Sequence, residues 1–122
     1  MDKRFWSRAK RKYTGGWIYG YYTECLSCNR IDDVIISPQS GTTFKIDVDL
    51  KTVCQCTGET DMNKTDIYEN DMVQDKAGNK YHIIWYYGSW CAVSIKGMFW
   101  YLPDLNNIEV IGNAIDNPEL IT

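Results

Sequence analysis

Four of the five cysteines of this 122-residue chain stand in two close pairs. Cys25 and Cys28 form a C-x-x-C pair, and Cys54 and Cys56 form a C-x-C pair. Tetrahedral zinc takes four thiolates, and a C-x-x-C turn supplies two of them. A C-x-C spacing is less usual for zinc, and on a strand both thiols would turn to one face, where small apolar side chains pack. We therefore favour buried structural cysteines and predict no metal or cofactor, with a four-cysteine zinc site as the open alternative.

The histidine and carboxylate residues do not stand in patterns that are typical of catalytic sites. The single histidine, His82, falls in a segment rich in aromatic and β-branched residues, and we predict a structural, exposed or hydrogen-bonded role for it. Asp47 and Asp49 alternate with apolar residues, as on the wet side of a strand, and Asp71 stands where a carboxylate bonds turn amides. The chain has no phosphate loop and no G-x-S-x-G or H-E-x-x-H motif. We predict that it is not an enzyme, with a metal-dependent hydrolase as the least favoured alternative.

Charge is unevenly distributed along the chain. Six basic residues against Asp2 give the first twelve residues a net charge of +5, which leaves −8 for the remainder of a chain whose total is −3. A basic segment beside aromatic residues can bind single-stranded nucleic acid by phosphate pairing and base stacking. The acidic remainder repels phosphate, so we favour a solvated terminus or one that pairs with a neighbouring subunit. The nucleic-acid alternative assigns contacts to Arg4, Arg8, Lys10, Arg11 and Lys12.

Strands are the elements that must position these residues, because period-two alternation dominates the sequence. One segment, 16–23, puts Trp17, Tyr19 and Tyr21 on one face. Further strands are predicted at residues 43–49, 81–87, 90–95, 98–102 and 108–112, with turns at 78–79, 88–89 and 97. Gly88-Ser89 is expected to form the tip of a hairpin, since glycine reaches positive φ without steric cost. The only predicted helical element is a short turn near residues 117–119.

The bulk composition favours a folded protein of one domain or two small lobes. A 44% hydrophobic fraction, with 14% aromatic residues, is enough for a core. No signal peptide or membrane-length apolar stretch is seen, and the cysteine count is odd, so we expect a soluble protein of the cytoplasm with reduced thiols. The polar stretch 57–64 suggests two lobes, residues 1–60 and 61–122.

Three segments together resemble the YopX family of phage and prophage proteins. They are Gly16-Trp-Ile-Tyr-Gly20, the stretch from Thr52 to Val73, and Ile108 to Leu120. The second contains Ile67-Tyr-Glu-Asn-Asp71, where the family usually has glycine in place of Asn70. Asn tolerates left-handed backbone better than most residues, so we expect Asn70 to keep that turn.

The resemblance implies an all-β protein with an N-terminal β lobe, followed by a C-terminal lobe that forms a small SH3-like barrel. It implies no activity, because the role of the family is not established. For the C-terminal lobe we predict five antiparallel strands from about Ile67 onward. The expected core is Ile67, Met72, Val73, alternate residues of 81–87, Val93, Ile95 and 108–111.

The function we favour is binding without catalysis. Small size, β-rich pattern and an excess of tyrosine and tryptophan are typical of proteins that pack against other proteins. We expect an uncharacterised phage or prophage accessory protein that binds a protein partner or itself as a homo-oligomer. Binding of nucleic acid through the basic N-terminal segment is the principal alternative. We expect no membrane partner, and the sequence identifies no small-molecule substrate.

Overall fold

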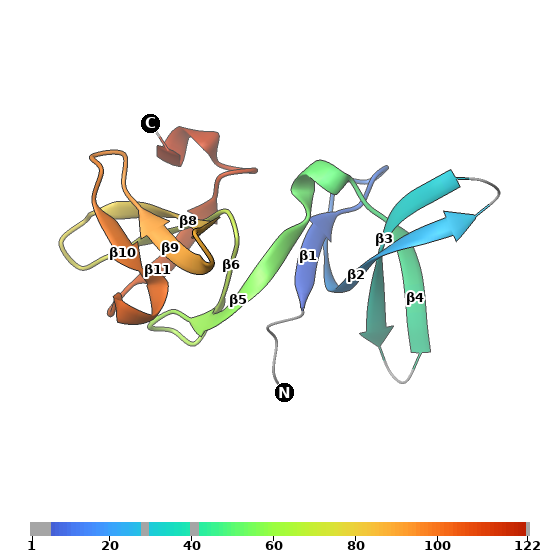
Figure 1. Ribbon diagram of the computed structural model, residues 1–122, viewed down its shortest axis with the longest axis horizontal. Coiled ribbons are helices and arrows are strands. Elements are labelled where there is room, and N and C mark those ends of the chain that lie inside the picture. Colours follow the sequence, from blue (N-terminus) through green and yellow to red (C-terminus); the bar gives the residue numbers. More distant parts are fainter. Residues whose placement is uncertain (1–5, 28–29, 40–41, 122) are drawn as a thin grey trace. The chain divides into compact units, whose positions relative to one another are not determined.

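The structure, a computed structural model, is built from strands and short helical turns (Figure 1). It describes residues 6–27, 30–39 and 42–121, and the side chains of residues 6–22 and 46–121. The strands form two antiparallel sheets, and each helical element in these ranges is a 3-10 turn of three or four residues. The prediction of a mainly β protein is confirmed. No helix in the described ranges is long and apolar enough to span a membrane.

The chain divides into two compact units, residues Met1–Cys56 and Thr57–Thr122. The boundary falls inside strand β5 (Cys54–Thr60), near the division after residue 60 that the sequence suggests. Each unit has a hydrophobic core of its own.

The first unit is an antiparallel sheet in which the short strand β1 lies between β2 and β5. β3 pairs with β2 on one side and with β4 on the other. Ala9, Ile18 and Val48 form the core, because each turns to the same side of the sheet. The elements are β1 (Ser7–Lys10), β2 (Trp17–Ser27), β3 (Arg30–Gln39), β4 (Thr42–Asp47) and the turn η1 (Leu50–Thr52).

The alternation predicted for β2 is confirmed. Ile18 and Gly20 are buried, whereas Trp17, Tyr19 and Tyr21 lie on the opposite, more exposed face. The aromatic face of this strand is therefore the outer one.

The second unit contains a five-stranded antiparallel sheet in the order β10-β9-β8-β7-β11, and its short strand β6 pairs with β5 instead. β7 to β10 pair in chain order, and β11 returns to pair with β7. The predicted five strands are confirmed, and their closure into an SH3-like barrel stays a prediction. The elements are β6 (Asp66–Tyr68), β7 (Asp71–Gln74), β8 (Lys80–Tyr86), β9 (Ser89–Val93), β10 (Phe99–Tyr101), η2 (Leu102–Asp104), β11 (Glu109–Asn113) and η3 (Pro118–Ile121).

The core of the second unit takes side chains from β6 to β9 and from the segments around β11. Of the predicted core residues, Ile67, Val73 and Ile108 are confirmed. The alternate residues of β8 that enter the core are Tyr81 and Ile83. The cluster consists of Ile67, Val73, Tyr81, Ile83, Ala92, Leu102 and Ile108.

Two predicted core positions are wrong. Val93 follows the buried Ala92 along β9, so it turns to the opposite face of the sheet and is only half-buried. Ile95 lies beyond the end of β9, in the turn that leads to β10, and is 72% exposed. Met72 is buried, as expected, but it alternates with Val73 and so stands outside the core cluster.

The hairpin between β8 and β9 differs by one residue from the prediction. Tyr86 pairs with Ser89, so the two-residue turn is Tyr87-Gly88 rather than Gly88-Ser89. Both turn residues have positive φ, 48° for Tyr87 and 79° for Gly88. This is the backbone of a type I′ turn, whose twist matches the twist of the paired strands. The register of β8 and β9 thus places a tyrosine where asparagine is usual.

Asn70 and Asp71 organise the turn between β6 and β7 as predicted. Asn70 has a φ of 70°, which confirms that it keeps a left-handed turn without glycine. Its amide donates to the carbonyl of Ile83 at 2.9 Å, and its carbonyl accepts from the amide of Ala114 at 2.7 Å. The buried Asp71 carboxylate accepts from the backbone amide of Tyr68 at 2.7 Å. Asp71 therefore bonds the turn backbone.

Candidate functional site

The basic N-terminal segment is part of the first sheet. Arg4 lies outside the described residues, and β1 pairs with β2 and β5. Arg8 is only 7% exposed, and its guanidinium carbon lies 4.7 Å from the ring centroid of Trp17. The Lys10 ammonium lies 5.5 Å from the same ring. These cations therefore pack on an aromatic side chain of their own sheet.

The remaining basic residues of this segment follow β1. Arg11 and Lys12 are exposed, and the Lys12 ammonium lies 5.8 Å from the ring of Tyr13, which is 82% exposed. A cation beside an exposed ring can contact both phosphate and base, so the nucleic-acid alternative rests on these three residues.

The cysteines are divided between described and undescribed regions. Cys54, Cys56 and Cys91 are buried free thiols, and the Cys54 thiol donates to the carbonyl of Thr52 at 3.3 Å. Cys28 and the side chain of Cys25 lie outside what the structure describes, so the four-cysteine zinc site stays a prediction. In the described part of the chain, no three histidine, cysteine or carboxylate side chains are grouped as metal ligands.

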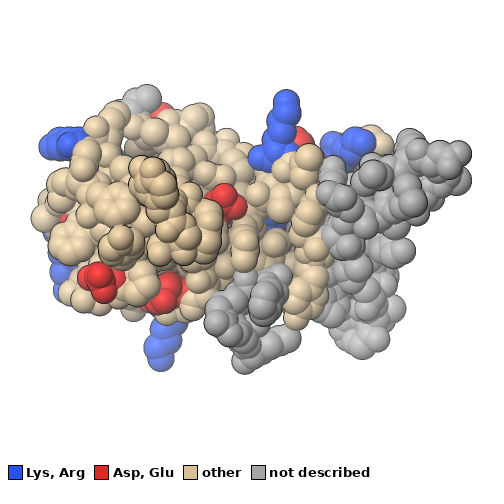
Figure 2. Space-filling view, in the orientation of Figure 1, with Lys and Arg blue, Asp and Glu red and all other residues tan. Residues whose placement is uncertain are grey.

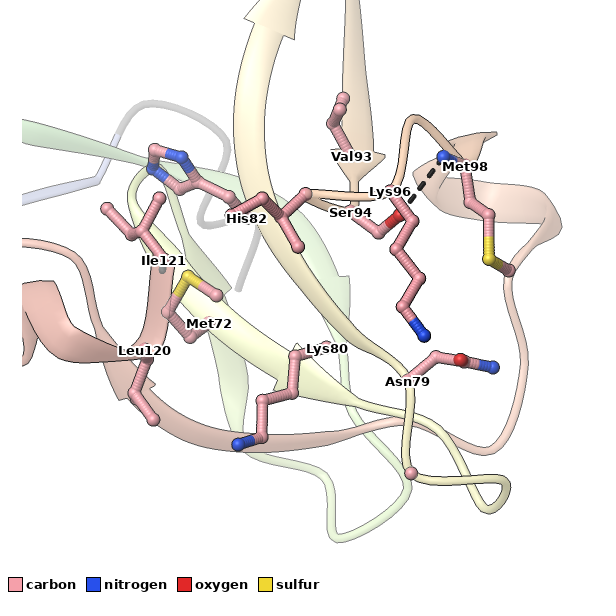
Figure 3. A pocket seen from close by; sticks show the side chains of 12 residues that line it. Met72, Asn79, Lys80, His82, Val93, Ser94, Lys96, Met98, Leu120 and Ile121 are labelled. Carbon is pink, nitrogen blue, oxygen red and sulfur yellow. Dashed lines mark hydrogen bonds between the residues drawn. The ribbon is translucent and has the colours of Figure 1, made fainter.

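His82 lies on β8 beside a hollow of about 230 Å³ (Figure 3). Its Nε2 is 2.9 Å from Oδ1 of Asn70, which confirms the predicted hydrogen-bonded role. Partial burial lowers the pKa of the imidazole below its usual range. Met72, Val93, Leu120 and Ile121 form apolar parts of the hollow, and Lys80 and Lys96 also line it. No carboxylate or thiol is among the residues that line this hollow, and the hydroxyl of Ser94, which does line it, accepts a hydrogen bond from the backbone amide of Met98 at 3.0 Å.

A second feature of this unit is an exposed aromatic surface on β8, β10 and the hairpin turn. We call it the aromatic surface, and it consists of Trp85, Tyr86, Tyr87, Phe99, Trp100 and Tyr101. Tyr87 is 90% exposed and Trp85 is 54% exposed. Single exposed apolar residues are ordinary, whereas exposed rings that touch one another, as those of Tyr86, Tyr87, Phe99 and Tyr101 do, are typical of interaction sites.

The strand register divides these rings between two faces. Trp85 stands opposite Trp90, and their ring centroids lie 4.9 Å apart in an edge-to-face contact on the side of the core. Phe99 and Tyr101 lie on the other side, where Phe99 contacts Tyr86 at 5.9 Å and Tyr101 at 5.6 Å. The sheet edge formed by β10 therefore presents aromatic rings on both of its faces.

A hollow of about 310 Å³ opens beside this surface, and we call it the aromatic hollow. Trp85 and Trp90 give it aromatic rings on the core side of the sheet, Pro103 of η2 adds a further apolar ring, and Tyr101 lies at its margin. Two carboxylate side chains, Glu59 and Asp104, also line it, and no basic side chain does. Within the hollow, negative charge thus accompanies flat apolar surfaces.

The charge distribution of the visible surface agrees with this arrangement. The face of the second unit that carries β9 and β10 is mostly uncharged, with acidic side chains on it and basic side chains at its margins (Figure 2). Such a surface suits a protein ligand better than a polyanion, because acidic groups repel phosphate.

Sequence reasoning did not locate the aromatic surface. Residues 81–87 are correctly predicted as a strand, with Ile83 and Trp85 on one face. Alternate residues of this segment were predicted to enter the core, but Trp85, which alternates in phase with Ile83, is exposed, as is Tyr86 on the other face. The sequence feature that could have indicated this surface is the density of aromatic residues at 85–87 and 99–101. Periodicity by itself assigns such residues to a core.

The chain is similar to one protein family and to a solved structure. The model of the YopX family, described as YopX protein, matches residues 6–122. No curated protein matches the chain. Among solved structures, the crystal structure of protein EF1440 from Enterococcus faecalis is similar, with 22% sequence identity and a TM-score of 0.56. The match covers 95% of this chain and 96% of that chain. At this identity the likeness shows a shared fold.

Proposed function

The chain belongs to the YopX family, and on that premise we propose that it is a non-enzymatic protein-interaction module. In this proposal it is encoded by phages or prophages, acts in the cytoplasm of the host cell, and binds a protein partner through the aromatic surface. Tyrosine and tryptophan suit this role, because they offer large contact area at a small cost in side-chain entropy.

The observation that carries the proposal is the backbone of Tyr87. A non-glycine residue with positive φ costs about 1–2 kcal/mol, and asparagine or glycine normally fills such a turn position. Tyr87 has a φ of 48° and is 90% exposed, so its ring gains little from burial within the unit. Its ring meets the ring of Tyr86 edge to face at 4.4 Å and otherwise lies in solvent. Departures from local preference that bring so little burial are typical of functional positions. We infer that the exposed ring serves contact with a partner.

Co-purification from infected or lysogenic host cells tests the proposal. The surface variant combines Tyr87→Asn with Phe99→Ser, and the control Tyr13→Ser removes an exposed aromatic ring outside the aromatic surface. We expect a partner that the wild type and the control retain and that the surface variant loses. Retention of the same partner by a folded surface variant would contradict the proposal.

Self-association is the second part of the proposal, because aromatic surfaces also join identical subunits. Light scattering over a range of concentrations measures it directly. We expect the apparent mass of the wild type to rise with concentration and that of the surface variant to stay at the monomer value. If the wild type stays monomeric at tens of micromolar, self-association is contradicted, whereas the proposed binding of a different protein is unaffected.

The nucleic-acid alternative has its own supporting observation in the exposed group formed by Arg11, Lys12 and Tyr13. It predicts binding to single-stranded oligonucleotides that weakens steeply with salt, because each neutralised phosphate releases counterions. Titration of an oligonucleotide at low salt decides between the two proposals, and absence of binding eliminates this one.

A further inference from the structure

We infer that the aromatic hollow binds a proline-rich segment of another protein, with an arginine or lysine beside the prolines. This inference rests on the proposed function and names the chemistry of the partner. Three properties of the hollow lead to it: its rings, its hydrogen-bonding groups and its charge.

The rings suit a ligand with flat apolar side chains and an extended backbone. Trp85 and Trp90 meet edge to face, and Tyr101 and Pro103 line the same hollow. Proline rings pack against such surfaces, and aromatic-lined grooves are the usual receptors for polyproline II segments. A proline-rich segment is already extended before it binds, so ordering it costs less entropy than ordering a flexible loop.

The hydrogen-bonding groups match a ligand that is short of N–H donors. The indole of tryptophan is a donor without an acceptor, and proline offers a backbone carbonyl without an N–H. Trp85 and Trp90 therefore suit the carbonyl groups of a proline-rich backbone. Thr57 is already used within the unit, since its hydroxyl donates to the carbonyl of Ile67 at 2.8 Å and accepts from the amide of Glu59 at 3.1 Å.

The charge of the hollow specifies a cation on the ligand. Glu59 and Asp104 are exposed and line the hollow together, without a basic side chain among the lining residues. A guanidinium or ammonium group beside the prolines would pair with these carboxylates. A phosphorylated or acidic ligand would meet like charge instead.

The partner is a different protein. The chain has three prolines, Pro38, Pro103 and Pro118, and no two of them are close in sequence. A second copy could therefore occupy other parts of the aromatic surface but could not offer a proline-rich segment to this hollow.

Titration with synthetic peptides, followed by tryptophan fluorescence and by heteronuclear NMR, tests the inference on the full chain. The first probe is a peptide of about ten residues that alternates prolines with two arginines, and it spans about 30 Å at about 3.1 Å per residue in the polyproline II conformation. The second replaces the arginines with glutamates, and the third replaces the prolines with glycine and serine. We expect binding of the first with a Kd of about 10–100 μM, and at least about tenfold weaker binding of the other two.

Matched variants locate the binding. Trp85→Ala removes an exposed ring, and Trp85→Phe keeps an aromatic surface at the same place. Glu59→Gln combined with Asp104→Asn removes both charges of the hollow, and Asp47→Asn combined with Glu109→Gln removes two exposed charges that do not line it. We expect about tenfold weaker binding for Trp85→Ala and for the hollow charge variant, partial recovery with Trp85→Phe, and wild-type binding for the charge control. Circular dichroism confirms that each variant is folded.

The outcomes separate this inference from the proposed function. If the wild type binds no proline-rich probe, or binds the glutamate probe equally well, the inference is overturned. The proposed function stands in that case if the Tyr87→Asn, Phe99→Ser variant still loses its partner. If that variant also retains the partner, both are overturned. Binding of the arginine probe that Trp85→Ala leaves unchanged would overturn the placement in the hollow.

Discussion

The carboxylate of Asp61 accepts a hydrogen bond from the backbone amide of Val110 at 2.9 Å, although 49 residues separate them in sequence. The other oxygen of Asp61 accepts from the amides of Asn63 and Thr65, each at 2.9 Å. One buried side chain therefore shapes the turn after β5 and joins it to β11. This relationship connects the beginning of the second unit to its last strand.

Replacement of Asp61 by alanine should destabilise the second unit strongly. Three amides would lose a charged acceptor, and a hydrogen bond to a charged group contributes about 1.5–3 kcal/mol, less where water can replace it, as at the exposed Asn63 and Thr65. We expect a loss of about 3 kcal/mol in the free energy of unfolding, measured by urea denaturation. The control Glu109→Ala removes an exposed carboxylate next to Val110 and should stay within about 0.5 kcal/mol of wild type. A loss below about 1 kcal/mol for Asp61→Ala would contradict the structural role.

Asn70 should tolerate glycine better than alanine. Alanine at a φ of 70° carries the left-handed strain and loses the contact with His82, which together should cost about 1–2 kcal/mol. Glycine loses the same contact but relieves the strain, so Asn70→Gly should lie within about 1 kcal/mol of wild type. Equal urea midpoints for the two variants would show that backbone strain at this turn is not decisive.

Tyr87→Asn should raise stability while weakening partner binding. Asparagine adopts positive φ more readily than tyrosine, so we expect the free energy of unfolding to rise by about 0.5–1 kcal/mol. The ring of Tyr87 is lost from the aromatic surface, so capture of the partner should fall. The control Gly88→Ala places a side chain at the other turn residue, whose φ of 79° favours glycine. It should therefore lower the free energy of unfolding. A destabilised Tyr87→Asn would show that the ring contributes to folding.

Stability should fall as the pH drops through the range in which histidine titrates. Partial burial lowers the pKa of His82 in the folded chain, so the unfolded chain binds a proton first. The stabilisation by neutral His82 is therefore present above about pH 6.5 and is lost as the pH falls toward the lower folded value. Urea midpoints from about pH 8 to pH 5 should show this decline in the wild type, and His82→Gln should flatten it. Parallel pH profiles of the wild type and His82→Gln would mean that His82 does not contribute to the pH dependence of stability.

Cys54, Cys56 and Cys91 should resist alkylation in the folded chain. All three thiols are buried, and burial raises the pKa of Cys91, so little reactive thiolate forms. Peptide mapping by mass spectrometry after a short exposure to iodoacetamide should find them unlabelled, and labelling in denaturant supplies the reference. Rapid labelling of Cys91 would contradict its burial on β9.

Local sequence predicted many of the strands, the shared face of β2 and the β6–β7 turn, but not β1 or β3. Alternation in 16–23 put Trp17, Tyr19 and Tyr21 on one face, and the backbone preferences of Asn70 and Asp71 predicted a left-handed turn whose amides a carboxylate bonds. These features depend on neighbours within a few residues, so the printed sequence contains their causes.

Tertiary structure alone decided which apolar residues are left on the surface. Ile95 and Trp85 look like core residues by composition, yet one lies past a strand end and the other beside an open hollow. The pairing of Tyr86 with Ser89 fixed the hairpin turn, because cross-strand register depends on both strands at once. The meeting of Glu59, Trp90 and Asp104 in one hollow likewise required strands distant in sequence to be neighbours. Exposure is a property of the whole assembly of strands, whereas alternation is a property of each strand by itself.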